Sequence, residues 1–165
     1  LASLKIMVVG IPNVGKSSFI NRISGRCPAR AEDRPGVTRA KNWYRLENGL
    51  DLLDTPGMLW PKLDDETAAQ NLAFTGAIRD EIIDTDELAI KLLFRLSKIC
   101  PDMLENRLGI TKELFCDGEA MLSAFGEKRG FLVKGGGADI SRAALKLLDE
   151  FRSGALGRIT LERAE

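Results

Sequence analysis

One stretch of this chain constrains its fold more than any other, the run Gly10-Ile11-Pro12-Asn13-Val14-Gly15-Lys16-Ser17. It follows the apolar residues 6–9 and leads into residues 18–23, where apolar side chains recur as in the first turns of a helix. A strand, a G-x-x-x-x-G-K-S loop and a helix in this order are what a phosphate-binding loop requires. The backbone N–H groups of such a loop wrap a phosphate, and the helix N-terminus adds positive potential. The run therefore predicts an α/β fold with a nucleoside triphosphate site; the alternative is a glycine-rich turn.

The side chains of this loop have separate expected roles. Lys16 would reach the β- and γ-phosphates, and the hydroxyl of Ser17 would ligate Mg²⁺. Together with a glycine further along the chain, the residues expected to contact the nucleotide are Asn13, Val14, Gly15, Lys16, Ser17, Ser18 and Gly57.

A second motif, Asp54-Thr55-Pro56-Gly57, begins 37 residues after Ser17 at the end of an apolar strand. Open parallel sheets bind their ligands at that edge. An aspartate there can hold Mg²⁺, commonly through water, opposite the loop serine. The Gly57 amide can meet a γ-phosphate oxygen, because glycine permits a close approach. On its own the motif would be an ordinary turn after a strand, but its distance from the loop favours a second part of the same site.

The polar segment 26–40 joins the two motifs. A loop of this length without structure of its own is usually functional or mobile. The hydroxyl of Thr38 in this segment can complete the Mg²⁺ shell and sense the γ-phosphate, so that the segment orders only in the triphosphate state. We therefore expect Ser17, Thr38 and Asp54 to be the Mg²⁺ ligands, and Lys16, Thr38 and Gly57 to be the catalytic residues.

Charge is balanced overall but uneven along the chain. Residues 1–50 hold nine Lys or Arg against three Asp or Glu, and residues 51–100 hold five against ten. A basic stretch beside a phosphate site can meet nucleic acid, although a solvated loop explains it equally well. No run of about 18 apolar residues is present, which argues against a membrane span. Three widely spaced cysteines without a C-x-x-C pair argue against a disulfide framework or a zinc site, and predict a reducing, cytoplasmic location.

Hydrophobic periodicity predicts the elements around the motifs. Residues 4–9 are expected to form a buried strand and residues 16–24 a helix. Strands are expected over 41–46 and 50–53, joined by a turn at 47–49 in which Asn-Gly is a strong hairpin signal.

From Asp84 onward the pattern becomes helical. Asp84 with Glu87 resembles a capping box, and apolar residues then recur at helical spacing until Pro101. A further helix is expected over about 111–125, which Asp117-Gly118 can interrupt.

A last helix is expected from Asp139 or Ser141 to Ser153, with three apolar residues on its core side, Leu145, Leu148 and Phe151. The glycine-rich residues 134–138 lack a Lys-Ser pair, so we expect a flexible connector and not a second phosphate loop. A domain boundary is expected near 80–84.

The motifs together resemble the switch apparatus of a GTPase, and the chain is similar to the circularly permuted GTPases, most closely to the ribosome biogenesis GTPase A (YlqF) family. Beyond the phosphate loop, matching text lies at residues 33–38, 53–62, 75–78, 126–130 and 156–160. The similarity extends along essentially the whole chain. Leu-Trp-Pro-Lys after the aspartate motif is far more specific than a phosphate loop.

This resemblance implies a partial P-loop GTPase domain of the circularly permuted type over residues 1–82, followed by a small all-helical C-terminal domain over residues 83–165. It implies a GTPase that binds GTP and GDP with Mg²⁺ and acts on the large (50S) ribosomal subunit, in contact with ribosomal RNA and proteins. A monomer away from the ribosome is expected, with neither a membrane nor DNA as partner.

The resemblance also gives Asn13 a role. It matches the asparagine that potassium-dependent relatives use to hold K⁺ beside the phosphates, so K⁺ is implied as a further ligand. A cation there would offset developing negative charge, much as an arginine finger does. A loop-capping side chain is the alternative role.

Two features of GTPases are missing from these 165 residues. Asn-Lys-x-Asp, the guanine-reading motif, does not occur; the permuted family places it ahead of the phosphate loop, so we expect this chain, which starts at Leu1, to be the C-terminal part of a longer protein. Met58 stands where a Ras-type enzyme has a water-orienting glutamine, and the chain has no histidine. Slow intrinsic hydrolysis is therefore expected.

Three other interpretations remain open at this point. The chain could be a non-enzymatic remnant of such a GTPase that binds RNA or protein. It could be an adenine-specific P-loop enzyme, or a potassium-dependent GTPase of the tRNA-modification or ferrous-iron type. The helical segment after residue 84 and the missing downstream guanine motif argue against the last of these.

Overall fold

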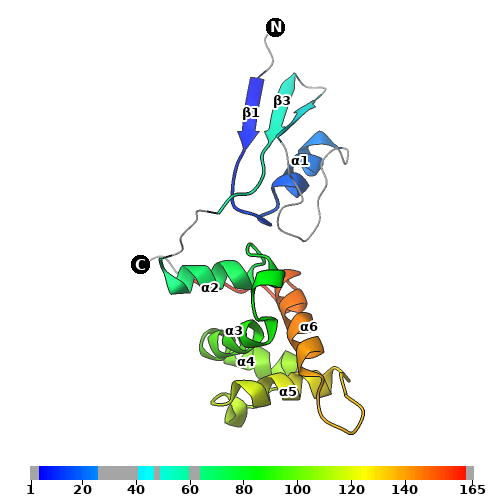
Figure 1. The fold of residues 1–165 in the computed structure, drawn as a ribbon. Coiled ribbons are helices and arrows are strands. Elements are labelled where there is room, and N and C mark those ends of the chain that lie inside the picture. Colours follow the sequence, from blue (N-terminus) through cyan, green and yellow to red (C-terminus); the bar gives the residue numbers. More distant parts are fainter. Residues whose placement is uncertain (1–3, 26–40, 47–48, 60–63, 163–165) are drawn as a thin grey trace. The chain divides into compact units, whose positions relative to one another are not determined.

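The structure is a computed structural model that describes residues 4–25, 41–46, 49–59 and 64–162. The chain is mixed α/β, as expected, and divides into two compact units, Leu1–Arg79 and Asp80–Glu165 (Figure 1). Each unit is described here by itself.

The first unit contains a three-stranded sheet in the order β1-β3-β2. β1 (Leu4–Val8) pairs in parallel with β3 (Leu50–Asp54), and β2 (Asn42–Arg45) pairs with β3 in the antiparallel direction. The hairpin that the Asn-Gly pair predicted is therefore confirmed. Its turn residues 47–48 lie outside the described part of the chain.

β1 forms as predicted, but the prediction of a buried strand is wrong. Three of its apolar side chains, Leu4, Ile6 and Met7, and the following Val9 are between 37% and 64% exposed, and Val8 is only partly buried. The reason is position in the sheet: the central strand is β3, where Leu52 and Asp54 are each 1% exposed, whereas β1 lies at an edge of the described sheet.

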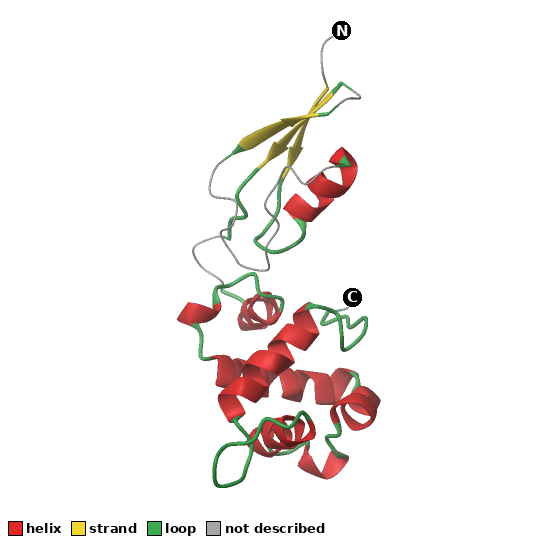
Figure 2. Ribbon diagram, turned by 90° about the vertical axis from the view of Figure 1, so that its right-hand side faces the viewer, coloured by secondary structure: helices red, strands yellow, loops and turns green. Residues whose placement is uncertain are grey.

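Helix α1 (Lys16–Ser24) covers one face of this sheet (Figure 2). Its buried Ile20 packs with Leu52 of β3, and three partly buried side chains complete the cluster, Val8, Tyr44 and Leu46. The helix ends at Gly25, which has the left-handed φ of 63° that glycine tolerates. This end agrees with the prediction.

Helix α2 (Glu66–Phe74) was not predicted from the sequence. Asp65 caps it, because its Oδ1 accepts hydrogen bonds from the backbone N–H groups of Thr67 at 2.8 Å and Ala68 at 3.2 Å. A turn at Gly76 follows, where φ is 74°.

The second unit is built from helices in its described part. They are η1 (Asp80–Ile82), α3 (Thr85–Ile99), α4 (Pro101–Met103) with the π-helical turn η2 (Leu104–Leu108), η3 (Lys112–Leu114), α5 (Gly118–Lys128) and α6 (Ile140–Arg152). The core lies between α3, α5 and α6, where Leu92, Leu122 and Leu147 are fully buried. Among the described residues, no helix combines the length and the apolar character needed to cross a bilayer.

Aspartate caps begin the long helices of this unit. Asp84 accepts hydrogen bonds from the N–H groups of Asp86 and Glu87, as the predicted helix start required, and Asp139 caps α6 in the same way. The helical stretch expected over 111–125 is interrupted at Asp117-Gly118, the position at which the sequence allowed a break. There the Asp117 carboxylate accepts from the N–H of Ala120 at 3.0 Å and starts α5 as a separate helix.

The core-facing stripe of α6 was predicted incorrectly at one position. Leu148 is buried, but Leu145 is 53% exposed. The buried face instead contains Ala143, Ala144 and Leu147. At 100° per residue, Leu145 lies well away from the centre of that face.

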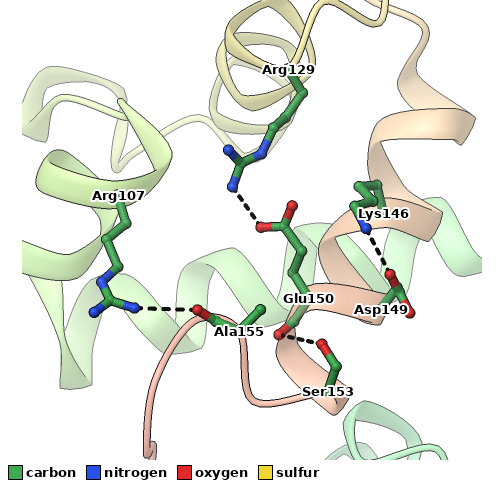
Figure 3. Close-up of polar contacts among 7 residues, drawn as sticks. All are labelled: Arg107, Arg129, Lys146, Asp149, Glu150, Ser153 and Ala155. Atoms are coloured by element: carbon green, nitrogen blue, oxygen red, sulfur yellow. Dashed lines mark hydrogen bonds and ion pairs between the residues drawn. The ribbon is translucent and has the colours of Figure 1, made fainter.

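Side-chain contacts fix the carboxyl end of α6 to its surroundings (Figure 3). Arg129 pairs with Glu150 at 2.6 Å, and the guanidinium of Arg107 donates to the carbonyl of Ala155 at 3.2 Å. Residues 134–138, expected to be a connector, join α5 to α6 through a tight turn closed by the bridge between Leu132 and Ala138.

Candidate nucleotide-binding site

The two sequence motifs meet at one edge of the sheet. Val8 at the end of β1 lies in register with Asp54 at the end of β3, so the loops that follow both strands leave the sheet side by side. The hydroxyl of Thr55 donates to the carbonyl of Val8 at 2.7 Å and ties the two exits together. This is the carboxyl edge at which α/β sheets place their ligands.

The phosphate loop closes with two residues in the left-handed region. Gly15 has φ 88° and Asn13 has φ 58°; Asn13 is the one non-glycine residue with positive φ in the described part of the chain. The amide of Phe19 then donates to the carbonyl of Gly15 at 2.8 Å and starts α1. The first N–H groups of a helix have no partner within it, so the loop delivers a helix N-terminus suited to an anion.

Ser17 and Asp54 lie in contact at the start of α1 and the end of β3. The hydroxyl of Ser17 donates to Oδ2 of Asp54 at 3.3 Å. Asp54 is 1% exposed, and within the described residues its Oδ1 has no hydrogen-bond partner. A buried carboxylate with an unsatisfied oxygen is costly unless a ligand compensates it. Hard oxygen atoms of this kind are what Mg²⁺ prefers, so these two residues fit a magnesium ion.

The ammonium group of Lys16 lies inside the same loop. Its Nζ donates to the carbonyl of Ile11 at 2.6 Å. Burial lowers the pKa of Lys16 from its ordinary value, and the negative charge of Asp54 partly opposes that shift. An incoming phosphate would supply the anionic partner that stabilises the charged ammonium.

Gly57 lies against the phosphate loop. A Cβ atom at this position would stand 2.6 Å from Cα of Pro12 and 2.9 Å from Nζ of Lys16. Real Cβ atoms essentially never approach other atoms below 3.0 Å, so the residue must be glycine for this packing to exist. Its position beside Lys16 is consistent with the expected approach of its amide to a terminal phosphate.

Asn13 makes a contact that the sequence did not suggest. Its Nδ2 donates to the carbonyl of Gly76 at 2.7 Å, across 63 residues of chain. Because the amide nitrogen is occupied in this way, the Oδ1 atom is the end of the side chain that is left to accept a donor or a cation.

Three other residues were expected at the site, Val14, Ser18 and Thr38. Val14 is 55% exposed and Ser18 is also exposed, while Thr38 lies outside the described residues. Met58, next to Gly57, is 76% exposed. No cluster of three or more His, Cys, Asp or Glu side chains suited to a metal occurs in the described ranges.

Sequence reasoning missed three residues that shape the site, Pro12, Thr55 and Gly76. Thr55 and Pro12 belong to the quoted motifs, so their position was known but not their contacts. Gly76 lies in residues 75–78, part of the text that resembles the family, but nothing in its spacing pointed to Asn13.

Comparisons with known proteins agree with this geometry. The ribosome biogenesis GTPase A of Priestia megaterium is 42% identical over 160 residues, which are 97% of this chain and 55% of that protein. The Thermotoga maritima protein of the same name is 33% identical over 98% of the chain and 57% of its own length. The chain thus spans about half the length of the curated relatives it matches.

Solved structures of YlqF are similar as well. A structure described as GDP-bound TM YlqF has a TM-score of 0.61 and 31% identity, and the match covers 99% of this chain and 62% of that one. GNP-bound YlqF from T. maritima has a TM-score of 0.59 at 31% identity, with 96% of this chain and 59% of that one covered. A family model described as 50S ribosome-binding GTPase matches residues 5–101. More than half of the chain therefore carries the family's pattern, and the chain belongs to the 50S ribosome-binding GTPases.

Proposed function

We propose that this chain is the phosphate-binding and switch-bearing part of a GTPase that acts in assembly of the large ribosomal subunit. The observation that carries the proposal is the contact between Ser17 and Asp54 behind the phosphate loop, with Lys16 beside them. Relatives named ribosome biogenesis GTPase A and the matching family support the ribosomal partner.

In this proposal Ser17 and Asp54, together with Thr38, hold Mg²⁺, and the backbone of residues 13–18 holds the phosphates. When bound, the ion would neutralise the charge of the β- and γ-phosphates. Lys16 would give up its bond to the carbonyl of Ile11 and donate to phosphate oxygen instead. The Gly57 amide would donate to the γ-phosphate, because no side chain separates it from the loop.

Asn13 is proposed to offer its Oδ1 to a K⁺ ion beside the phosphates. The hydrogen bond from its Nδ2 to Gly76 supports this, since it fixes which end of the amide remains available. An Asn13→Asp variant separates the role of K⁺ ligand from the role of hydrogen-bond donor to Gly76. It keeps an oxygen ligand but cannot donate to the Gly76 carbonyl. If K⁺ is held by Oδ1, Asn13→Ala removes the preference for K⁺ over Na⁺ in nucleotide binding, whereas Asn13→Asp retains it.

Hydrolysis by these residues alone is proposed to be slow. Met58 follows Gly57 and has a thioether where a water-orienting group would be needed, and its side chain is 76% exposed. Activation would have to come from another source, which the proposal assigns to the ribosomal partner.

The finer architecture is also a proposal: a circularly permuted GTPase domain followed by an all-helical C-terminal domain. The relatives are nearly twice as long as this chain, and the described β1 has an edge position with exposed apolar side chains. Both observations support an additional segment that completes the sheet. The helices α3, α5 and α6 with their shared core support the helical domain.

Competition between nucleotides tests the proposal on this chain. A fluorescently labelled GTP analogue is bound to the chain, and unlabelled GTP, ATP and inorganic triphosphate are each tested for their ability to displace it. Lys16→Ala is the negative variant, and Met58→Ala is a matched neighbour outside the contacts. Saturable binding that is lost in Lys16→Ala and kept in Met58→Ala is expected. Absence of saturable binding by the parent chain would leave the non-enzymatic remnant, and displacement by ATP but not GTP would replace the GTPase by an adenine-specific enzyme.

A further inference from the structure

The sheet of the first unit has a second face, opposite the one that α1 covers. Tyr44 and Leu52 point to the α1 side, where they pack around Ile20. Side chains alternate along strands, so Trp43 and Asp51 belong to the opposite face. Register confirms the grouping, because Asp51 lies opposite Lys5 of β1 and opposite Arg45 of β2.

Trp43 is the most prominent side chain on this face. It is 55% exposed, and Nζ of Lys5 stands 5.8 Å from the centroid of its ring. A tryptophan ring left half exposed on a sheet is a large flat surface that a second planar group can cover. The ammonium group of Lys5 lies over one face of this ring, so a stacking base has to share the ring with it or use the other face.

The hollow beside the ring is large enough for a small planar group. It is lined by Lys5, Trp43, Arg45 and Asp51 and has a volume of about 450 Å³. Known ligand sites span roughly 300–1,000 Å³. One nucleobase with its sugar fits such a space.

The charge of this face favours an anion. Among the residues that the structure describes, the carboxylate of Asp51 is the one acidic group lining the hollow, and Arg45 neutralises it at 3.2 Å. The Arg45 side chain nevertheless remains 85% exposed, whereas that of Asp51 is only 11% exposed. The accessible charges are therefore the two cations, in a stretch of sequence that carries nine basic and three acidic residues over positions 1–50.

We propose that this face binds single-stranded RNA, with one base stacked on Trp43 and adjacent phosphates paired with Lys5 and Arg45. Proteins that hold single strands combine these two elements, an aromatic platform and flanking cations. An acidic peptide would use the cations but would leave the ring without a planar partner. The choice of RNA as the polyanion rests on the proposed function; the stacking site itself rests on the geometry.

Fluorescence of Trp43 gives a direct readout. The chain has two tryptophans, so a Trp60→Phe background isolates the signal of Trp43. We expect an unstructured RNA of about ten nucleotides to quench it in a saturable way. Trp43→Ala should weaken RNA binding by about 5- to 150-fold, the range for loss of one base stack, and Trp43→Phe should restore most of it. Lys5→Ala should make the slope of log binding constant against log salt concentration shallower by about the amount that one phosphate contact contributes.

Phe19→Ala is the matched control, because Phe19 is an aromatic side chain of the same unit with nearly equal exposure, 53%, on a different element. It should bind RNA as the parent does. Unchanged Trp43 emission on adding RNA, or equal RNA affinity in Trp43→Ala and the parent, would overturn the proposal. So would shielding of Trp43 from acrylamide in the RNA-free chain, because a protein segment would then cover the ring. Quenching of Trp43 by RNA in a chain that binds no guanine nucleotide would contradict the proposed function but not the stacking site.

Discussion

Replacing Gly57 by alanine is the sharpest perturbation of the candidate site. The added methyl group would lie 2.6 Å from Cα and 2.7 Å from N of Pro12, both of them backbone atoms that cannot rotate away. Ordinary van der Waals contact begins near 3.4 Å, so the loop and the Asp54–Gly57 segment must separate by about 0.8 Å. The third close atom, Nζ of Lys16 at 2.9 Å, would be displaced as well.

Such overpacking typically costs about 1–3 kcal/mol. If the displacement falls on the nucleotide-binding arrangement, the dissociation constant for a guanine nucleotide rises by roughly 5- to 150-fold, at 1.4 kcal/mol per factor of ten. Isothermal titration calorimetry of Gly57→Ala against the parent measures this, and thermal unfolding shows whether the unit remains folded. Met58→Ala, one residue further and 76% exposed, is the control and should change neither quantity. A Gly57→Ala variant with parental affinity and parental stability would refute the packing argument.

Other predictions concern charge and packing. Because burial lowers the pKa of Lys16, nucleotide affinity should fall as pH rises through that lowered value, before an ordinary lysine would lose its proton. Nucleotide titrations from neutral to alkaline pH check this. Lys16→Arg should not show the loss of affinity. Between the lowered pKa of Lys16 in the folded chain and its ordinary value in the unfolded chain, the unfolded chain binds more protons. The stability of the unliganded unit should therefore rise with pH in that range. Leu148→Ala should lower the free energy of unfolding by about 2–5 kcal/mol, and Leu145→Ala by less than about 0.5 kcal/mol, since only Leu148 is buried. Urea unfolding followed by circular dichroism measures both values. Equal losses would contradict the assignment of the buried face of α6. Asp80→Ala should cost about 1 kcal/mol in the same assay, because both its oxygens bind Arg152 at 2.7 and 2.8 Å, whereas Asp149→Ala should change little.

Local signals in the sequence predicted the elements that begin or end on a specific side chain. The Asn-Gly pair predicted the hairpin of β2 and β3, and Asp84 predicted the start of α3. For α6 the sequence offered Asp139 or Ser141 as the start, and the structure has Asp139 as the cap. These succeed because a turn or a cap depends on a few neighbouring atoms. Helix α2 was missed because its run of small residues, Ala68 and Ala69 among them, has no strong apolar period.

Properties that depend on distant partners were predicted less well. The apolar run of β1 predicted a buried strand. Burial depends on which strands and helices flank a strand, and the described sheet leaves β1 at an edge. The residue types at the site were predictable from motif spacing, whereas the bond from Asn13 to Gly76 was not, because no local rule links positions 63 residues apart.

The central claim is that the phosphate loop and Asp54 form one magnesium-dependent nucleotide site. Its most direct test is the affinity of this chain for a fluorescent GTP analogue, measured with and without Mg²⁺ for the parent and for Asp54→Asn. The account predicts that Mg²⁺ tightens binding by roughly tenfold or more in the parent, which corresponds to at least about 1.4 kcal/mol, and by much less in Asp54→Asn. An equal effect of Mg²⁺ in both chains would contradict it.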